Sequence, residues 1–160
     1  MSDAATPQTS QEAGLPVLEA RAVLLGQHAA DRDEAVRRCG RLLVDIGAVE
    51  EPYIDAMLAR EHDISTYVGE GVAIPHATHA GRASVIRDAL AVVGFTEPVA
   101  WEGGQVRVCV AIAARGDAHM AVLSHLAEIL LDPPSAQALR EADDPDAVLR
   151  LLAPAADALT

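Results

Sequence analysis

The chain has 160 residues, of which 51% are hydrophobic and 2% aromatic, so Leu, Val, Ile and Ala must supply most of its core. All 12 basic residues are arginines, and the 24 acidic residues give a formal net charge of −12. Without a basic stripe to hold a phosphate backbone, this composition excludes a nucleic-acid-binding protein. The acidic surface suits a basic protein partner, and it equally suits simple solubility.

Neither a leader peptide nor a membrane segment is indicated. Residues 1–11 have no basic region and no apolar core, so we expect no signal peptide there. No apolar run approaches the roughly 20 residues that cross a bilayer, so we expect no direct membrane insertion. Cys39 and Cys109 fall in a predicted helix and a predicted apolar strand, which indicates reduced core residues. We expect a cytoplasmic protein.

The chain begins with a segment that lacks hydrophobic periodicity. Residues 1–19 are rich in Ala, Ser, Gln, Pro and Gly, which predicts a flexible N-terminal tail before a domain over residues 20–155. Residues 21–25 form a short apolar run typical of a strand. Apolar residues then recur at helical spacing after a cap at Asp31 or Asp33.

A second helix and a short strand are expected next. Gly47 is a suitable end for the first helix, and Pro52 is a suitable first-turn residue for the second. A polar stretch over residues 61–71 leads into an apolar segment at residues 72–74. Pro75 ends that segment, as it would end a buried strand.

The second half predicts two strands followed by three helices. Residues 89–95 and 106–113 are β-rich apolar runs. A helix follows residues 116–117, Pro133 begins a shorter one, and a last helix ends near Leu152. Helices interspersed with strands predict an α/β fold, a mixed β-sheet covered by helices in a single compact domain.

The segment at residues 69–78 contains the candidate functional group, an imidazole. His76 follows Pro75 at the end of the predicted buried strand, where a sheet commonly presents functional groups. Ala77 and Thr78 are small and leave room for a bulky group to approach. On these residues alone, a functional histidine and a turn histidine without a role remain equally open.

A second histidine, His119, is predicted in the first turn of the helix that follows Gly116. The N–H groups and positive dipole end of a helix N-terminus favour a phosphate there and disfavour an imidazolium. The same residue shares an apolar stripe with Val122 and Leu126, which is also typical of a core histidine.

The string Gly-Val-Ala-Ile-Pro-His at residues 71–76 resembles the phosphorylation-site signature of mannitol/fructose-type enzyme IIA domains of bacterial sugar phosphotransferase systems. Three further stretches continue the resemblance in the same order: residues 57–61, 65–70 and 112–119. The similarity runs from about Leu24 to about Leu152, and Ala-Ala-Arg at 113–115 favours the mannitol branch. One departure is Ala77, where members of the family commonly have glycine.

The resemblance implies a phosphoryl relay without a cofactor. The phosphocarrier HPr would phosphorylate His76, which would pass the group to a cysteine of a cognate enzyme IIB, and the membrane permease IIC would deliver the sugar. By the same resemblance, His119 would hydrogen-bond the phosphoryl oxygens and Arg60 would offset their charge. Glu70 matches a further site position, where it would orient Arg60 or an imidazole, or complement a basic partner.

Other functions remain open at this point. Within the family, a fructose-specific domain and a regulatory, nitrogen-type enzyme IIA keep the same histidine chemistry. A metal-binding module would instead use the three imidazoles of His76, His79 and His119, although no cysteine or carboxylate stands at convincing spacing.

Overall fold

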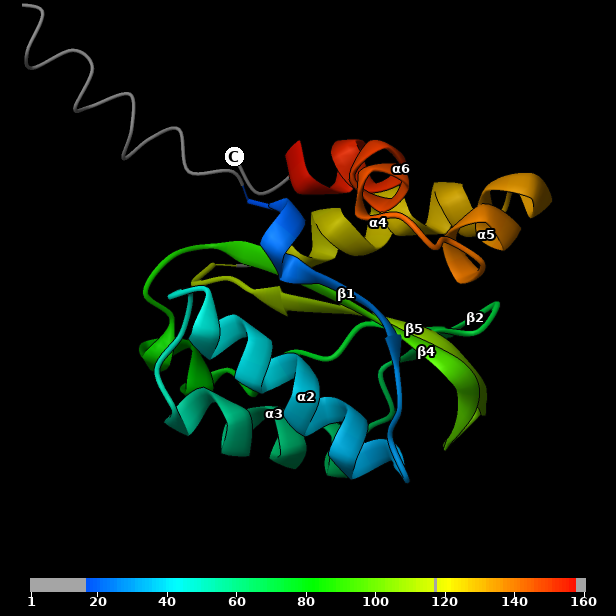
Figure 1. The fold of residues 1–160 in the computed structure, drawn as a ribbon. Helices are drawn as coiled ribbons and strands as arrows, with labels where there is room; N and C mark the ends of the chain where they lie inside the picture. The colour runs from blue at the N-terminus through cyan, green and yellow to red at the C-terminus, as the bar shows by residue number, and fades with distance from the viewer. Residues whose placement is uncertain (1–16, 117, 158–160) are drawn as a thin grey trace, which may run out of the picture.

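The computed structural model describes residues 17–116 and 118–157, with the side chains of 118, 119 and 154–157 outside that description. A five-stranded sheet forms the middle layer. Two helices cover one face and three cover the other (Figure 1): α2 (Arg32–Asp45) and α3 (Pro52–Asp63) on one, and α4 (Ala118–Leu130), α5 (Pro133–Arg140) and α6 (Pro145–Asp157) on the other. The predicted α/β class, a mixed sheet covered by helices, is confirmed.

The strand order is β1-β4-β5-β3-β2. The strands are β1 (Val23–Gln27), β2 (Tyr67–Gly69), β3 (Val72–Ala73), β4 (Ala89–Trp101) and β5 (Gly104–Ala113). The pairs β1–β4 and β3–β5 are parallel, whereas β4–β5 and β2–β3 are antiparallel. Because β3 and β5 run in the same direction, the segments that follow them begin at the same edge of the sheet.

Strand β4 is longer than the sequence predicts. The apolar run ends at Phe95, but the strand continues to Trp101 through a register shift between Gly94 and Val99. Pro98 lies exposed inside this irregular segment, where no ladder hydrogen bond is required of it. Val99 and Trp101 then return to the core.

The helix boundaries follow local chemistry. Of the two candidate caps, Asp31 begins α2, because its side chain accepts a hydrogen bond of 2.9 Å from the Glu34 backbone N–H. Gly47, with a φ of 79°, follows the C-cap of α2 in the left-handed conformation. The last helix runs to Asp157 rather than ending near Leu152, so it continues past Pro154.

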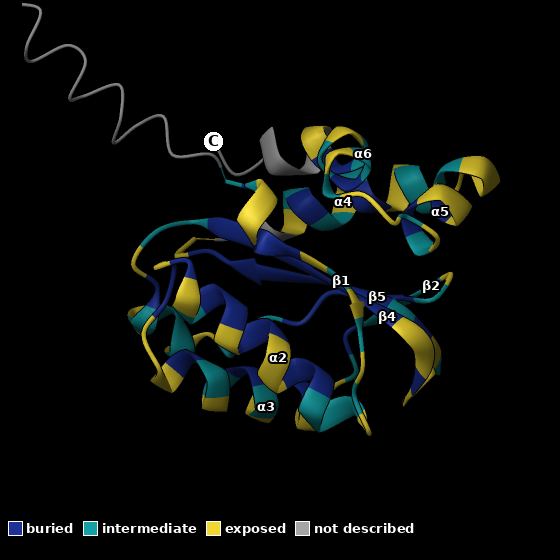
Figure 2. Cartoon of the chain, viewed as in Figure 1, coloured by how far each residue is buried: buried dark blue, intermediate teal, exposed yellow. Residues whose placement is uncertain are grey.

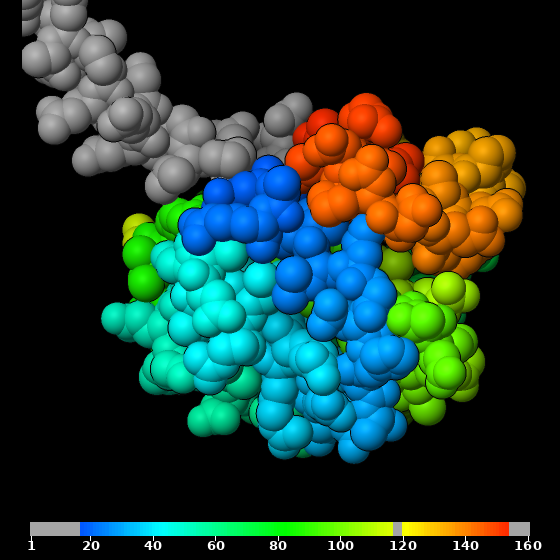
Figure 3. Space-filling view, in the orientation of Figure 1, coloured from blue at the N-terminus to red at the C-terminus, as the bar shows by residue number. Residues whose placement is uncertain are grey.

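Residues 17–19, just before the expected start of the domain, pack against the sheet. Leu18 is buried, the Leu90 N–H donates to the Val17 carbonyl at 2.8 Å, and Arg87 pairs with Glu19 at 3.0 Å. These three residues are thus held by contacts with the rest of the described chain, and the remainder of the predicted tail, residues 1–16, lies outside the described residues. Figure 3 shows the strand that follows, β1, at the surface between α2 and α6, as expected of an edge strand.

The core fills the space between the sheet and the inner faces of its helices (Figure 2). Residues 89–95 of β4 are buried without alternation because helices cover both faces of the sheet. Cys39 and Cys109 are both fully buried free thiols, and burial raises the pKa of the Cys109 thiol. They are core residues, as predicted. No helix within the described ranges has both the length and the apolarity to cross a membrane.

Candidate functional site

His76 lies directly beyond β3, at the edge of the sheet where β5 also ends. The Ile112 N–H donates to the Pro75 carbonyl at 3.0 Å, which extends the pairing of β3 and β5 up to the histidine. The imidazole Nδ1 lies 2.8 Å from the Ile74 carbonyl oxygen. Since a carbonyl oxygen can only accept, Nδ1 carries the proton and the lone pair of the neutral ring resides on Nε2. The backbone therefore selects the tautomer of the candidate nucleophile.

Tyr53 on α3 holds the backbone on both sides of this site. Its hydroxyl donates to the Ile112 carbonyl at 2.7 Å and accepts from the Ala77 N–H at 3.3 Å. The side chain is 1% exposed. Burial raises the pKa of Tyr53 to about 12, against the opposing influence of the Ala77 N–H and of the Arg82 charge. The phenol thus stays protonated and can make both bonds at once.

A small hollow opens beside the imidazole. Its lining consists of Tyr53, His76, Ala77, Arg82, Ile112 and Ala114. Two of these side chains, Tyr53 and Arg82, are polar groups that the sequence motifs do not include. Both come from elements outside the segment with the histidine motif, and only their position in the fold draws attention to them.

Arg82 reaches the hollow because the chain turns back after the histidine. Residues Ala80–Ser84 form a short 3-10 helix, η3, in which the Gly81 N–H donates to the Thr78 carbonyl at 3.0 Å. Gly81 packs so closely that an added Cβ would lie 2.4 Å from the Ala56 Cβ and 2.9 Å from the Ala77 Cβ. Only glycine allows this approach of η3 to α3 and to the histidine loop.

His119 is in the first turn of α4, as predicted. This helix follows β5, so its N-terminus begins at the edge of the sheet where His76 follows β3. The N–H groups of that first turn are oriented along the helix axis toward this edge. The backbone of α4 therefore brings its N-terminus to the edge that carries His76, while the His119 side chain lies outside the described residues.

Arg60 lies one helical turn from the histidine loop. The Thr78 N–H contacts the Ala56 carbonyl at 3.4 Å, and Ala56 and Arg60 share a face of α3 at a spacing of four residues. The guanidinium donates to the Ile64 carbonyl and so closes the C-terminal end of the helix. Arg60 is not among the residues that line the hollow beside His76.

Glu70 lies at the opposite end of β3 from His76. It has a left-handed backbone, with a φ of 54°, in the turn between β2 and β3. Arg140 of α5 donates to both the backbone carbonyl and the carboxylate of Glu70, at 3.1 and 3.2 Å. In this structure the partner of Glu70 is thus Arg140, rather than the Arg60 or imidazole expected from the resemblance.

A buried carboxylate falls in the polar stretch at residues 61–71 that precedes the histidine motif. Glu61 is the last buried residue of α3 and is fully inaccessible. It accepts hydrogen bonds from the Thr66 N–H at 2.7 Å, the Thr66 hydroxyl at 2.6 Å and the Trp101 indole at 2.9 Å. The Thr66 carbonyl in turn accepts from the Ile74 N–H at 3.0 Å. Glu61 therefore anchors the segment that leads to His76.

Three other histidines are placed elsewhere. His62 lies 3.0 Å from the Asp33 carboxylate, His28 is exposed after β1, and His79 is exposed at the start of η3. Among the side chains that the structure describes, no three His, Cys, Asp or Glu residues are grouped as metal ligands. The three-imidazole hypothesis includes His119 and stays a question for elemental analysis.

Comparisons with known proteins agree with this architecture. Residues 16–154 match the family described as "Phosphoenolpyruvate-dependent sugar phosphotransferase system, EIIA 2". A multiphosphoryl transfer protein of Escherichia coli is 40% identical over 128 residues, 79% of this chain, which spans only 34% of that protein. The mannitol-specific phosphotransferase enzyme IIA component of Halalkalibacterium halodurans is 35% identical over 136 residues, 85% of this chain and 94% of that protein.

Similarity in three dimensions leads to the same family. A chain of the Escherichia coli complex of mannitol enzyme IIA with phosphorylated mannitol enzyme IIB superposes with a TM-score of 0.79 at 34% identity. The superposition covers 85% of this chain and 98% of that one. The resemblance found in the sequence is thereby confirmed, and the chain belongs to the EIIA 2 family of phosphoenolpyruvate-dependent sugar phosphotransferase systems.

Proposed function

We propose that this protein is a phosphoryl carrier that accepts a phosphoryl group from HPr on His76 and passes it to a cysteine of enzyme IIB during mannitol uptake. The observation that carries the proposal is the hydrogen bond between His76 Nδ1 and the Ile74 carbonyl. It fixes the tautomer with a nucleophilic Nε2 on an imidazole at the edge of the sheet. Phosphorylation is therefore assigned to Nε2.

The transfer balances without a cofactor. The Nε2 lone pair attacks phosphorus in line, the N–P bond of the donor histidine breaks, and the donor keeps that electron pair. The phosphorylated ring gains positive character, so its Nδ1–H bond to the Ile74 carbonyl becomes charge-assisted. In the second step a thiolate of the acceptor attacks phosphorus, and Nε2 leaves as neutral imidazole with its proton still on Nδ1.

The motif positions supply the remaining roles in this proposal. His119, at the N-terminus of α4, would hydrogen-bond the phosphoryl oxygens together with the first-turn N–H groups. Arg60 would release the Ile64 carbonyl and offset the added charge of about −2. Glu70 would complement a basic partner while it pairs with Arg140.

The partners and substrate are proposed from the relatives. A mannitol-specific enzyme IIA component and a IIA–IIB complex for mannitol support enzyme IIB as the acceptor and mannitol as the sugar. HPr as donor, IIC as permease and a cytoplasmic location complete the proposal. A fructose-specific or a regulatory, nitrogen-type role would use the same chemistry at His76.

The test is labelling by phosphoenolpyruvate through enzyme I and HPr, with the intact protein beside His76→Ala. We expect acid-labile, base-stable label on the intact protein and none on the variant. Transfer to purified mannitol IIB, and not to fructose IIB, would support the mannitol assignment. Label that persists on His76→Ala would overturn the proposed acceptor.

A further inference from the structure

A phosphoryl group on His76 needs a nearby cation, and arginine is the only permanently charged cationic side chain in this sequence. Its formal net charge is −12, it contains no lysine, and phosphorylation adds about two further negative charges. A planar guanidinium is well suited to phosphoryl oxygens because it donates in a fixed fork. Any permanently charged side chain that binds the phosphoryl group must therefore be an arginine near His76.

Most arginines around this edge are directed to backbone carbonyls. Arg115 donates to the Val85 and Ile86 carbonyls, and its own N–H donates to Asp88. Arg87 donates to the Ile46 carbonyl and to Glu19, and Arg60 donates to the Ile64 carbonyl. These contacts connect loops and helix ends, and none of these three arginines is among the residues that line the hollow.

Arg82 is different, because its side chain lines the same hollow as His76. We propose that Arg82 is a phosphoryl-binding residue, whose guanidinium donates to oxygens of the phosphoryl group on His76 Nε2. This inference rests on the proposed function and assigns to its site a residue that the histidine motif does not include.

The fold holds the Arg82 backbone firmly in this position. The Arg82 N–H donates to the His79 carbonyl at 3.2 Å, and its carbonyl accepts from the Val85 N–H at 3.0 Å. Close packing of Gly81 on α3 fixes where η3 lies. A half-buried arginine on a fixed backbone loses less side-chain freedom on binding than one on an open loop.

The electrostatic influence of Arg82 also reaches the site. Its charge acts against the burial that raises the pKa of Tyr53 to about 12. The Tyr53 hydroxyl accepts from the Ala77 N–H, one residue from the proposed acceptor. The guanidinium charge is thus felt beside His76, inside a hollow that screens it less than open water does.

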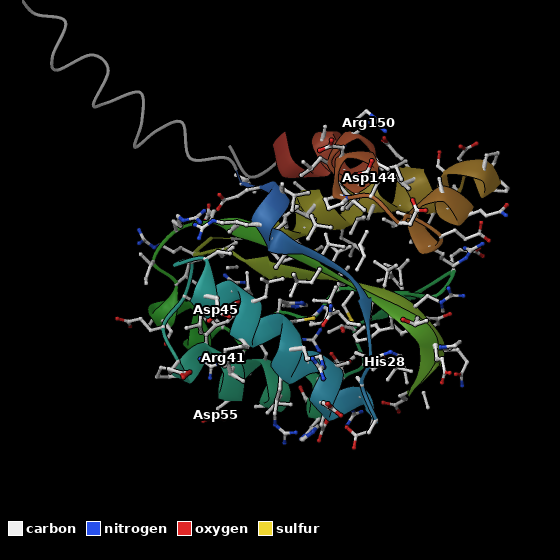
Figure 4. The ribbon with its side chains drawn as sticks, in the orientation of Figure 1. His28, Arg41, Asp45, Asp55, Asp144 and Arg150 are labelled. Atoms are coloured by element: carbon white, nitrogen blue, oxygen red, sulfur yellow. The ribbon has the colours of Figure 1, made fainter. Side chains whose placement is uncertain are left out.

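The test compares Arg82→Gln and Arg82→Lys with the intact protein. Arg150→Gln is the charge-matched control, because Arg150 is exposed on α6, away from the sheet (Figure 4). The first readout is the rate of phosphoryl transfer from phosphorylated HPr. We expect Arg82→Gln to be slower by about tenfold or more, Arg82→Lys to recover part of the rate, and Arg150→Gln to stay within about twofold.

The second readout is a ³¹P NMR titration of the phosphorylated proteins, which a merely structural role would not alter. Loss of a bound cation should raise the pKa of the phosphoryl group in Arg82→Gln, and the lysine variant should restore it. An unchanged phosphoryl pKa would overturn the inference, even with a slower rate, as would Arg82→Gln transfer within about twofold of the intact protein. If the intact protein took no label, the proposed function itself would fail, which is a distinguishable result.

Discussion

The indole N–H of Trp101 donates to the carboxylate of Glu61 at 2.9 Å, where Glu61 is fully inaccessible to solvent and Trp101 is 7% exposed. The pair connects the end of β4 to the end of α3, and the same carboxylate holds Thr66 through two more hydrogen bonds. Three donors thus converge on one buried carboxylate. Its hydrogen bonds are made within the protein, and water cannot replace them if one is lost.

Replacing Glu61 with glutamine should destabilise the protein by about 2–3 kcal/mol. The amide lacks the negative charge, so three charge-assisted hydrogen bonds become weaker neutral ones, and its NH₂ group requires the Thr66 hydroxyl to turn from donor to acceptor. Urea unfolding followed by the fluorescence of the single tryptophan measures this directly. Glu102→Gln, an exposed change next to Trp101, should shift stability by no more than about 0.5 kcal/mol. Equal stabilities of the two variants would contradict the network's importance.

Tyr53→Phe should lower both stability and phosphoryl acceptance. Removing the hydroxyl leaves the Ile112 carbonyl and the Ala77 N–H without this hydrogen-bond partner, which should lower the free energy of unfolding by about 1–3 kcal/mol. Because Ala77 follows the proposed acceptor, His76 should also be held less accurately. We expect slower transfer at temperatures where the variant is still fully folded by circular dichroism. Transfer at the original rate would show that Tyr53 serves stability alone.

Gly81→Ala tests whether close packing of η3 shapes the site. The added methyl would lie too close to the Ala56 and Ala77 methyl groups. Either η3 must therefore move, or the free energy of unfolding must decrease by about 1–3 kcal/mol. Gly116→Ala is the matched change, since an added Cβ there meets nothing within 4 Å. Thermal unfolding of the two variants should separate them clearly, and coinciding melting curves would refute the packing argument.

Acid should loosen the start of the domain. Burial acts to raise the pKa of Glu19, but hydrogen bonds from Arg21 and Arg87 outweigh it and leave the pKa below the ordinary 4.5. A pKa that is lower in the folded state stabilises the fold above that ordinary value, and the contribution is lost as pH falls through the folded pKa. As the pH falls from about 6 to about 3, the melting temperature of Glu19→Gln should therefore decrease less than that of the intact protein. Parallel losses in the two proteins would argue against this pair.

The sequence predicts well those features that depend on neighbouring residues. Asp31, Gly47 and Pro52 act through their own backbone and the adjacent turn, so the limits of α2 and the start of α3 can be found from the local pattern. The motif around His76 is equally local. Its identification needed no knowledge of which strand lies beside it.

Features that depend on distant partners are not predictable in this way. Glu61 looks like a surface charge until Trp101, forty positions along, supplies a donor. Strand β4 passes Pro98 because β5 provides a partner on the far side of the bulge. Arg82 comes to line the hollow beside His76 only because Gly81 lets η3 pack closely on α3. In each case a tertiary contact outweighs the local preference.

The parallel pairing of β3 with β5 also sets when the site comes into existence. During synthesis His76 leaves the ribosome well before β5 and α4 have been made, and the intervening β4 must first find its antiparallel partner. Pairing of segments so far apart is a late and slow event in folding. A nascent or partly folded chain therefore exposes the imidazole of His76, the proposed acceptor, before β5 and α4 lie beside it. In the proposed function, only fully folded molecules would then accept the phosphoryl group, so phosphorylation would indicate that folding is complete.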